Sequence, residues 1–141
     1  HGIKASPAPY FNLEEEFEMQ QAIKGLIANE LVSAVHDVAD GGLYVTLVEM
    51  SMPRGLGFDI VSDADIRLDA FLFGEGQGRV VVSVNEDQEE EFIEFMMESG
   101  VNFTLLGHVT KGKMMVDDEH FGFITEAKDI YDNALGKHLE N

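Results

Sequence analysis

Residues 36–43 read His-Asp-Val-Ala-Asp-Gly-Gly-Leu, a segment at which one kind of backbone gives way to another. The apolar run at residues 31–38 predicts a buried strand, and the leucine-, valine- and methionine-rich run at residues 43–52 predicts a helix. The two glycines turn the chain between them. A glycine turn that leads into a helix presents backbone N–H groups to a small anion, so this segment is a candidate ligand loop.

A second glycine-flanked segment, residues 73–79, reads Phe-Gly-Glu-Gly-Gln-Gly-Arg. It leads into a valine-rich run at residues 79–84, which predicts a central strand. A third motif, Leu-Gly-His-Val-Thr, occupies residues 106–110. The glycines of the second segment match neither the P-loop nor the dinucleotide-binding fingerprint. The diagnostic feature is therefore the set of three motifs, not any one of them.

In this order and spacing, the three motifs resemble the C-terminal domain of the aminoimidazole-ribonucleotide-synthetase superfamily. The family's usual patterns are H-D-V-S-D-G-G-L, F-G-E-S-Q-G-R and L-G-x-V-T. The resemblance covers nearly the whole chain and implies an α+β fold, with helices packed on a mixed β-sheet. Ala39 and Gly76 stand where the family usually has serine, so two hydroxyls are missing from the presumed ligand loops.

The resemblance also implies an activity. It points to an ATP-dependent ligase of purine biosynthesis, which converts formylglycinamide ribonucleotide to its amidine with ammonia taken from glutamine. In that reaction ATP activates the amide oxygen as a phosphorylated imidate, and ammonia then displaces phosphate. ATP and Mg²⁺ are the implied cofactors of the whole enzyme, and none is expected to be tightly bound by this fragment.

The implied domain organisation is that of a fragment. The chain begins with His1, and we expect residues 1–11 to be an extended linker and residues 12–141 to be the C-terminal domain of the second of two tandem repeats. The expected partners are the remaining domains of the same polypeptide and the small and glutaminase subunits of the complex. The expected location is the cytoplasm, and the isolated domain is expected to be inactive.

The first motif supplies five candidate binding residues: His36, Asp37, Asp40, Gly41 and Gly42. The two aspartates have oxygens that suit a ribose or Mg²⁺, and the histidine can donate to a phosphate. The alternative is local structure. An aspartate then caps the following helix, the histidine bonds to nearby backbone, and the glycines serve only the turn.

The second motif supplies three further candidates: Glu75, Gln77 and Arg79. Glutamate suits a metal or an amide, glutamine both donates and accepts, and the arginine fork suits a phosphate or carboxylate. The alternative is an internal ion pair of Arg79 with Glu75 or Asp37. No residue is assigned a catalytic role, and the sequence does not identify a set of metal ligands.

Composition limits the classes of partner. Lys plus Arg number 9 and Asp plus Glu number 27, a net charge of -18. Such a field repels nucleic-acid phosphate, so no nucleic-acid partner is expected. No stretch approaches the ~20 apolar residues of a membrane span, so no membrane partner is expected either. The absence of cysteine excludes disulfides and thiolate metal sites.

The rest of the chain predicts alternating helices and strands. Asn12, with Glu15 three residues on, predicts the start of a helix that ends near residue 29. An acidic helix is predicted at residues 86–99, with Phe92, Ile93, Phe95 and Met96 on its buried face and Gly100 as its stop. The remaining predictions are a strand at 57–61, a helical turn at 68–73, a hairpin of strands 103–109 and 114–116, a strand at 121–124, and a final helix capped by the Thr125 hydroxyl.

Two other functions stay open at this point. One is membership of another enzyme of the superfamily, such as aminoimidazole ribonucleotide synthetase or selenophosphate synthetase. The other is a structural or docking domain that binds no small molecule. A ligand-binding wall predicts that the loops at residues 36–42 and 74–79 converge, whereas a docking domain lets them lie apart.

Overall fold

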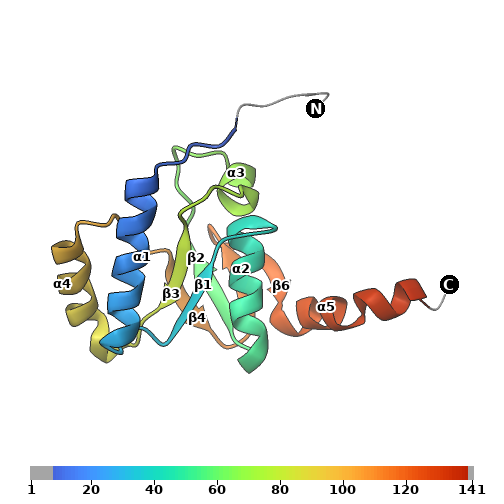
Figure 1. Cartoon of the computed structure of the whole chain (residues 1–141). Helices are drawn as coiled ribbons and strands as arrows, with labels where there is room; N and C mark the ends of the chain where they lie inside the picture. The colour runs from blue at the N-terminus through green and yellow to red at the C-terminus, as the bar shows by residue number, and fades with distance from the viewer. Residues whose placement is uncertain (1–7, 140–141) are drawn as a thin grey trace. The chain divides into compact units, whose positions relative to one another are not determined.

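The computed structural model describes residues 8–139 (Figure 1). The chain divides into two compact units, each formed by two separate stretches of sequence. The first unit takes His1–Asp40 and Glu75–Phe103, and the second takes Gly41–Gly74 and Thr104–Asn141. Residues 8–11, within the predicted linker, have no regular secondary structure, and residues 1–7 lie outside the described part. The predicted domain boundaries stay a prediction.

The first unit packs two helices beside a short two-stranded sheet. Its elements are α1 (Leu13–Ala28), β1 (Ala34–Asp37), β3 (Val80–Ser83), the 3-10 turn η2 (Glu86–Gln88) and α4 (Glu89–Ser99). Strands β1 and β3 pair antiparallel, and α1 packs against α4. Leu26, Leu31, Phe92 and Met96 form its buried core.

Helix α1 begins where the sequence predicts. The Asn12 side-chain oxygen accepts from the backbone N–H groups of Glu14 and Glu15, which satisfies two donors that a helix start leaves unpaired. The Asn12 amide donates in turn to the Glu15 carboxylate at 3.0 Å. Glu15 is therefore the reciprocal partner, although it accepts from the Asn12 side chain rather than from the Asn12 backbone.

Two predictions about strands in this unit are wrong, one on the burial of a strand and one on its position in the sheet. Strand β1 covers only Ala34–Asp37 and is half-buried at its centre and exposed at its ends, so it is not a buried strand. Strand β3 is not central, because it belongs to a two-stranded sheet among the described residues. Helix α4 and its stop at Gly100 are confirmed, but Ile93 is 37% exposed and lies off the buried face.

The second unit is a four-stranded mixed sheet with helices. Strands β2 (Gly57–Ile60), β4 (Gly107–Thr110), β5 (Lys113–Val116) and β6 (Glu119–Phe123) lie in the order β4-β2-β5-β6. Strand β2 runs antiparallel to β4 and parallel to β5. Helices α2 (Gly42–Ser51), α3 (Leu68–Phe73) and α5 (Ile124–Leu139) and the 3-10 turn η1 (Met52–Arg54) complete it. The α+β class with a mixed sheet is confirmed.

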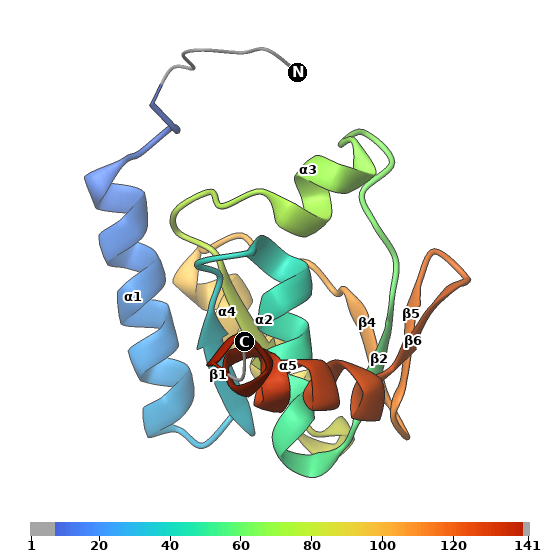
Figure 2. The ribbon, with the colours of Figure 1, turned by 90° about the vertical axis from the view of Figure 1, so that its right-hand side faces the viewer.

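The predicted hairpin joins the wrong pair of strands. Strands β4 and β5 follow each other in the sequence but do not pair, because β2 lies between them. Strand β5 instead forms a hairpin with β6, seen in orange at the right of Figure 2. Its turn residues Asp117 and Asp118 have φ angles of 51° and 65°, the left-handed pair that a type I′ two-residue hairpin turn requires.

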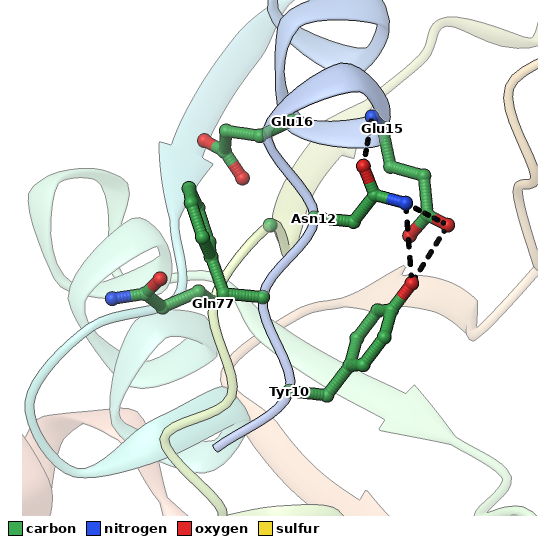
Figure 3. Close-up of a pocket in the computed structure, with 7 residues that line it drawn as sticks. Tyr10, Asn12, Glu15, Glu16 and Gln77 are labelled. Carbon is green, nitrogen blue, oxygen red and sulfur yellow. Dashed lines mark hydrogen bonds between the residues drawn. The ribbon is translucent and has the colours of Figure 1, made fainter. Parts of the chain in front are cut away.

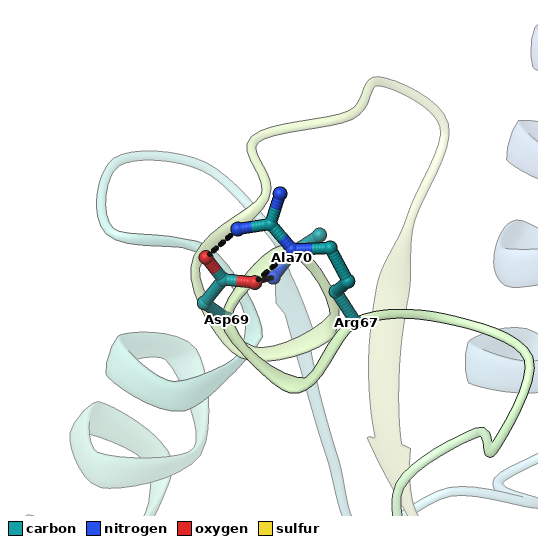
Figure 4. A network of polar contacts seen from close by, with 3 residues as sticks. All are labelled: Arg67, Asp69 and Ala70. Atoms are coloured by element: carbon teal, nitrogen blue, oxygen red, sulfur yellow. Dashed lines mark hydrogen bonds and ion pairs between the residues drawn. The ribbon is translucent and has the colours of Figure 1, made fainter. Parts of the chain in front are cut away.

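Helix boundaries in this unit show which side chains cap them. Helix α5 begins at Ile124, so Thr125 lies inside it and is not the cap; the Glu126 carboxylate instead accepts from the Phe123 N–H at 3.2 Å. Before α3, the guanidinium of Arg67 donates to both carboxylate oxygens of Asp69 (Figure 4).

Among residues 8–139, no helix is long and apolar enough to cross a membrane.

The β5–β6 turn is tied to the end of β2 by a carboxylate. The Ser62 N–H donates to Asp117 Oδ1 at 2.7 Å, and the Ser62 hydroxyl donates to Asp117 Oδ2 at 2.6 Å. Both bonds favour the charged form, and they hold the pKa of the Asp117 carboxyl below its ordinary value. Such a group stabilises the fold above its ordinary pKa, and this contribution is lost as the pH falls through the lowered pKa.

We expect the Ser62→Ala variant to raise the pKa of Asp117 toward its ordinary value, because the hydroxyl bond is the larger cause of the shift. The acid-induced loss of stability would then begin at a higher pH. NMR titration of the Asp117 carboxyl measures the change, and Ser99→Ala, in the first unit, is the control. An unchanged Asp117 titration in Ser62→Ala would show that the hydroxyl bond is not made in solution.

Candidate functional site

Residues 36–40 of the first motif and residues 75–79 of the second lie side by side in the first unit. Strand β1 carries the start of the first motif, and β3 follows the end of the second. Their register pairs His36 with Val81 and Asp37 with Val80, and the Val38 N–H donates to the Arg79 carbonyl at 2.9 Å. Backbone pairing thus brings together segments that lie far apart in the sequence, as a ligand-binding wall requires.

His36 is held by the backbone of its neighbour. Its Nδ1 lies 2.7 Å from the Asp37 carbonyl oxygen and 3.6 Å from the Asp37 carboxylate. A carbonyl only accepts, so Nδ1 carries the proton, and Nε2 then donates only when the ring is an imidazolium. The local bond foreseen as an alternative is therefore present. Phosphate donation from Nε2 would need the charged ring.

The polar side chains of the first unit differ in burial. Asp37, Asp40, Glu75 and Gln77 are exposed, whereas Arg79 is half-buried. Burial lowers the pKa of the Arg79 guanidinium from its ordinary value, since a charged group is less stable away from water. Arg79 is thus a partly desolvated cation at the strand start, where an anion or carboxylate is attracted more strongly than in open water.

A small pocket lies between the Gln77–Gly78 backbone and the start of α1 (Figure 3). Its volume is about 90 Å³, well below that of a nucleotide site, and the carboxylates of Glu15 and Glu16 line it. It is therefore unsuited to a phosphate. Tyr10 and Phe11, which the sequence predicts to be part of the linker, also line this pocket; two adjacent aromatic residues were the only signal of this role in the sequence.

In the second unit, the two motifs meet again. Gly41 and Gly42 have φ angles of 84° and 70°, and Gly41 occupies the N-cap position that the capping alternative would give to an aspartate. A Cβ on Gly42 would lie 2.7 Å from the Phe73 carbonyl carbon and 2.8 Å from the Leu72 oxygen. Gly42 therefore serves both the turn and the close approach of α2 to the end of α3.

An aromatic group adjoins this contact. The ring of Tyr44 lies 5.7 Å from that of Phe73, 5.8 Å from Phe121 and 6.0 Å from Phe58. Burial raises the pKa of the Tyr44 hydroxyl. Phe73, the first residue of the second motif, is 51% exposed, so one ring of the group lies at the surface. Tyr44 is not among the predicted site residues, because an aromatic residue in an apolar helix gives no signal of its own.

The described residues do not form a complete metal-binding site. Among residues 8–139, no group of three or more histidine, aspartate or glutamate side chains is placed to hold a metal ion. Asp37, Asp40 and Glu75 offer the oxygen ligands that Mg²⁺ prefers, but the described residues do not assemble a complete set.

Comparison with known proteins gives the family. The family model described as "AIR synthase related protein, C-terminal domain" matches residues 9–118. Phosphoribosylformylglycinamidine synthase subunit PurL of Salinibacter ruber is 43% identical over 123 residues, covering 84% of this chain and 16% of the relative. The PurL subunit of Moorella thermoacetica is 35% identical over 107 residues, covering 76% of this chain and 15% of the relative.

The fold has a counterpart among solved structures. Thermotoga maritima PurL complexed with FGAR superposes with a TM-score of 0.72 at 16% identity, over 89% of this chain and 23% of that one. At this identity the likeness concerns the fold. The chain spans only 16% and 15% of the length of the two relatives named above. With a family model that matches most of its residues, the chain belongs to the family of C-terminal domains of AIR synthase-related proteins.

Proposed function

We propose that this chain is the C-terminal domain of the second repeat of a phosphoribosylformylglycinamidine synthase. The observation that carries the proposal is the antiparallel pairing of β1 and β3, which places the first motif beside the second. The similarity to PurL subunits supports this choice over other enzymes of the superfamily. The reaction would join ammonia to formylglycinamide ribonucleotide with cleavage of ATP to ADP and phosphate.

In this proposal the chain supplies one wall of a binding cleft. Arg79 would clamp a phosphate or carboxylate, Gln77 would donate and accept, and His36, Asp40 and Glu75 would contact the polar groups of the ligand. Asp37, Gly41 and Gly42 would shape the loop. The missing serine hydroxyls at Ala39 and Gly76 favour an auxiliary site over the catalytic one.

The rest of the enzyme would supply what this chain does not. ATP is expected as a substrate of the whole enzyme, and we assign most Mg²⁺ and nucleotide ligands to domains outside the chain. The isolated domain would be inactive. The proposed partners are those other domains and the small and glutaminase subunits. The solved structure of PurLQS from Thermotoga maritima supports this proposal. The cytoplasm is the proposed location.

The test compares the chain alone with the full-length polypeptide that contains it. We expect the full-length protein to release ADP from ATP when formylglycinamide ribonucleotide and ammonium are supplied with Mg²⁺, and the 141-residue chain to release none. A full-length protein without ADP release dependent on formylglycinamide ribonucleotide would contradict the proposed reaction. Turnover by the chain alone would contradict the assignment of catalysis to other domains.

The role of Arg79 is tested by Arg79→Ala in the full-length enzyme, with Arg67→Ala as the control. Arg67 is an exposed arginine paired with Asp69 outside both motifs. A ligand contact predicts that Arg79→Ala weakens ligand binding by roughly 10- to 100-fold at unchanged stability. An internal ion pair predicts lower stability instead. Loss of kcat at unchanged stability would contradict the auxiliary role and place Arg79 at the catalytic site.

A further inference from the structure

The Asp40–Gly41 pair is chemically distinct from every other part of the chain. Asp40 is the only aspartate or asparagine in the sequence that precedes a glycine. Glycine has no Cβ, so a neighbouring carboxyl group reaches its backbone nitrogen with the least steric hindrance. The pair lies in the turn between β1 and α2, where the first unit ends and the second begins, and neither residue belongs to the buried core.

The side chain of Asp40 is also free to turn toward that nitrogen. Asp40 is exposed, lies outside every helix and strand and, in the described part of the chain, its carboxylate forms no hydrogen bond or ion pair. Other carboxylates in turns are held in place. Asp117 accepts two bonds from Ser62, and Asp63 accepts from the Asp65 N–H at 2.9 Å. No comparable bond fixes the Asp40 carboxylate.

We propose that Asp40 is a site of spontaneous isomerisation to isoaspartate. The Gly41 nitrogen attacks Cγ of Asp40, and one carboxyl oxygen leaves as water, with the amide proton and a proton from solvent. The product is a cyclic succinimide. Water then adds to the main-chain carbonyl carbon of Asp40 and breaks its bond to the Gly41 nitrogen. The chain now continues through Cβ and Cγ, and the water released in the first step is balanced by the water consumed in the second.

The modification alters the entry to α2. It lengthens the main chain by a methylene group and converts the former main-chain carbonyl of Asp40 into a free carboxylate. The two residues that follow, Gly41 and Gly42, hold left-handed φ angles of 84° and 70°, and Gly42 lies close against the end of α3. The loss of a ligand contact by Asp40 would rest on the proposed function, whereas the isomerisation itself goes beyond that function and does not depend on it.

Incubation of the folded 141-residue chain in H₂¹⁸O at neutral pH tests the proposal, because each succinimide that is hydrolysed takes up ¹⁸O. Trypsin cleaves after Arg54, so Asp40 and Asp65 fall in different peptides, and mass spectrometry with electron-transfer fragmentation locates label and isoaspartate. Asp65 is the internal control. It is likewise exposed in a turn, and over residues 8–139 its carboxylate has no bond, but the β-branched Ile66 follows it. We expect roughly 10-fold or more label at Asp40 than at Asp65.

Asp40→Glu is the matched variant, because it keeps the charge but would have to close a larger ring, which forms far more slowly. It acquires no label at residue 40. The same incubation in guanidinium chloride measures the unrestrained reaction, and the folded chain reacts within roughly 10-fold of that rate, because the turn needs no local unfolding to react. Equal labelling of Asp40 and Asp65 overturns the proposal. So does undiminished labelling of the Asp40→Glu variant, or a stronger suppression by folding, which would show that the turn holds Asp40 away from the Gly41 nitrogen.

Discussion

Replacement of Gly57 by alanine is expected to lower the free energy of unfolding by about 3 kcal/mol or more. Strands β4 and β5 flank β2 on both sides, and the short connection between them passes across the first residue of β2. A Cβ on Gly57 would collide with the Lys113 carbonyl oxygen, and it would lie 2.7 Å from the Gly112 carbonyl carbon. Backbone atoms cannot rotate away as a side chain can, so the connection itself would have to move.

Urea denaturation followed by far-UV circular dichroism measures this loss. Gly136→Ala is the control, because its Cβ enters open space in a helix, and it should raise stability by roughly 0.5–1 kcal/mol. If the Gly57→Ala variant has the same urea midpoint as the wild type, the connection between β4 and β5 does not cross β2 as the structure places it.

Replacement of Leu26 by alanine is expected to lower the free energy of unfolding by about 3–4 kcal/mol. This is the second of the two largest expected effects. Leu26 is 1% exposed and packs with Leu31, Phe92 and Met96 in the core of the first unit. Removing three carbons there loses apolar burial and leaves a cavity, since the surrounding helices relax only in part.

Ile27→Ala gives the matched comparison on the next residue of α1. Ile27 is 55% exposed, so its truncation should lower the free energy of unfolding by less than about 1 kcal/mol. The two variants are compared by the midpoints of their urea denaturation curves, provided that the m-values are equal. Equal losses would mean that α1 does not present Leu26 to the core in solution.

The convergence of the motifs shows how much of the candidate site the sequence could predict. The sequence identified both glycine-flanked segments, and the pairing of His36 with Val81 and Asp37 with Val80 confirms that they adjoin. It did not show that Tyr10 and Phe11 line a pocket beside Gln77, or that Gly42 abuts the end of α3. Those contacts depend on which surfaces meet, and no local pattern encodes that.

The sequence by itself determined the features that depend on neighbouring residues. The Asn12 cap, the stop of α4 at Gly100 and the glycine turn before α2 were predicted because capping and turn geometry act over three or four residues. The family, too, could be recognised from three short motifs. These features need no knowledge of the rest of the fold.

Only the tertiary structure decided the pairing of the strands. The sequence predicted a hairpin of the strands now seen as β4 and β5, because a short glycine-containing connection usually joins neighbouring strands. In the folded chain β2 inserts between them, and the connection passes where a Cβ on Gly57 would lie. A strand pairs with the neighbouring strand that lets it bury its apolar face. Here the paired strands lie some fifty residues apart in the sequence, so no local pattern predicts which of them pair.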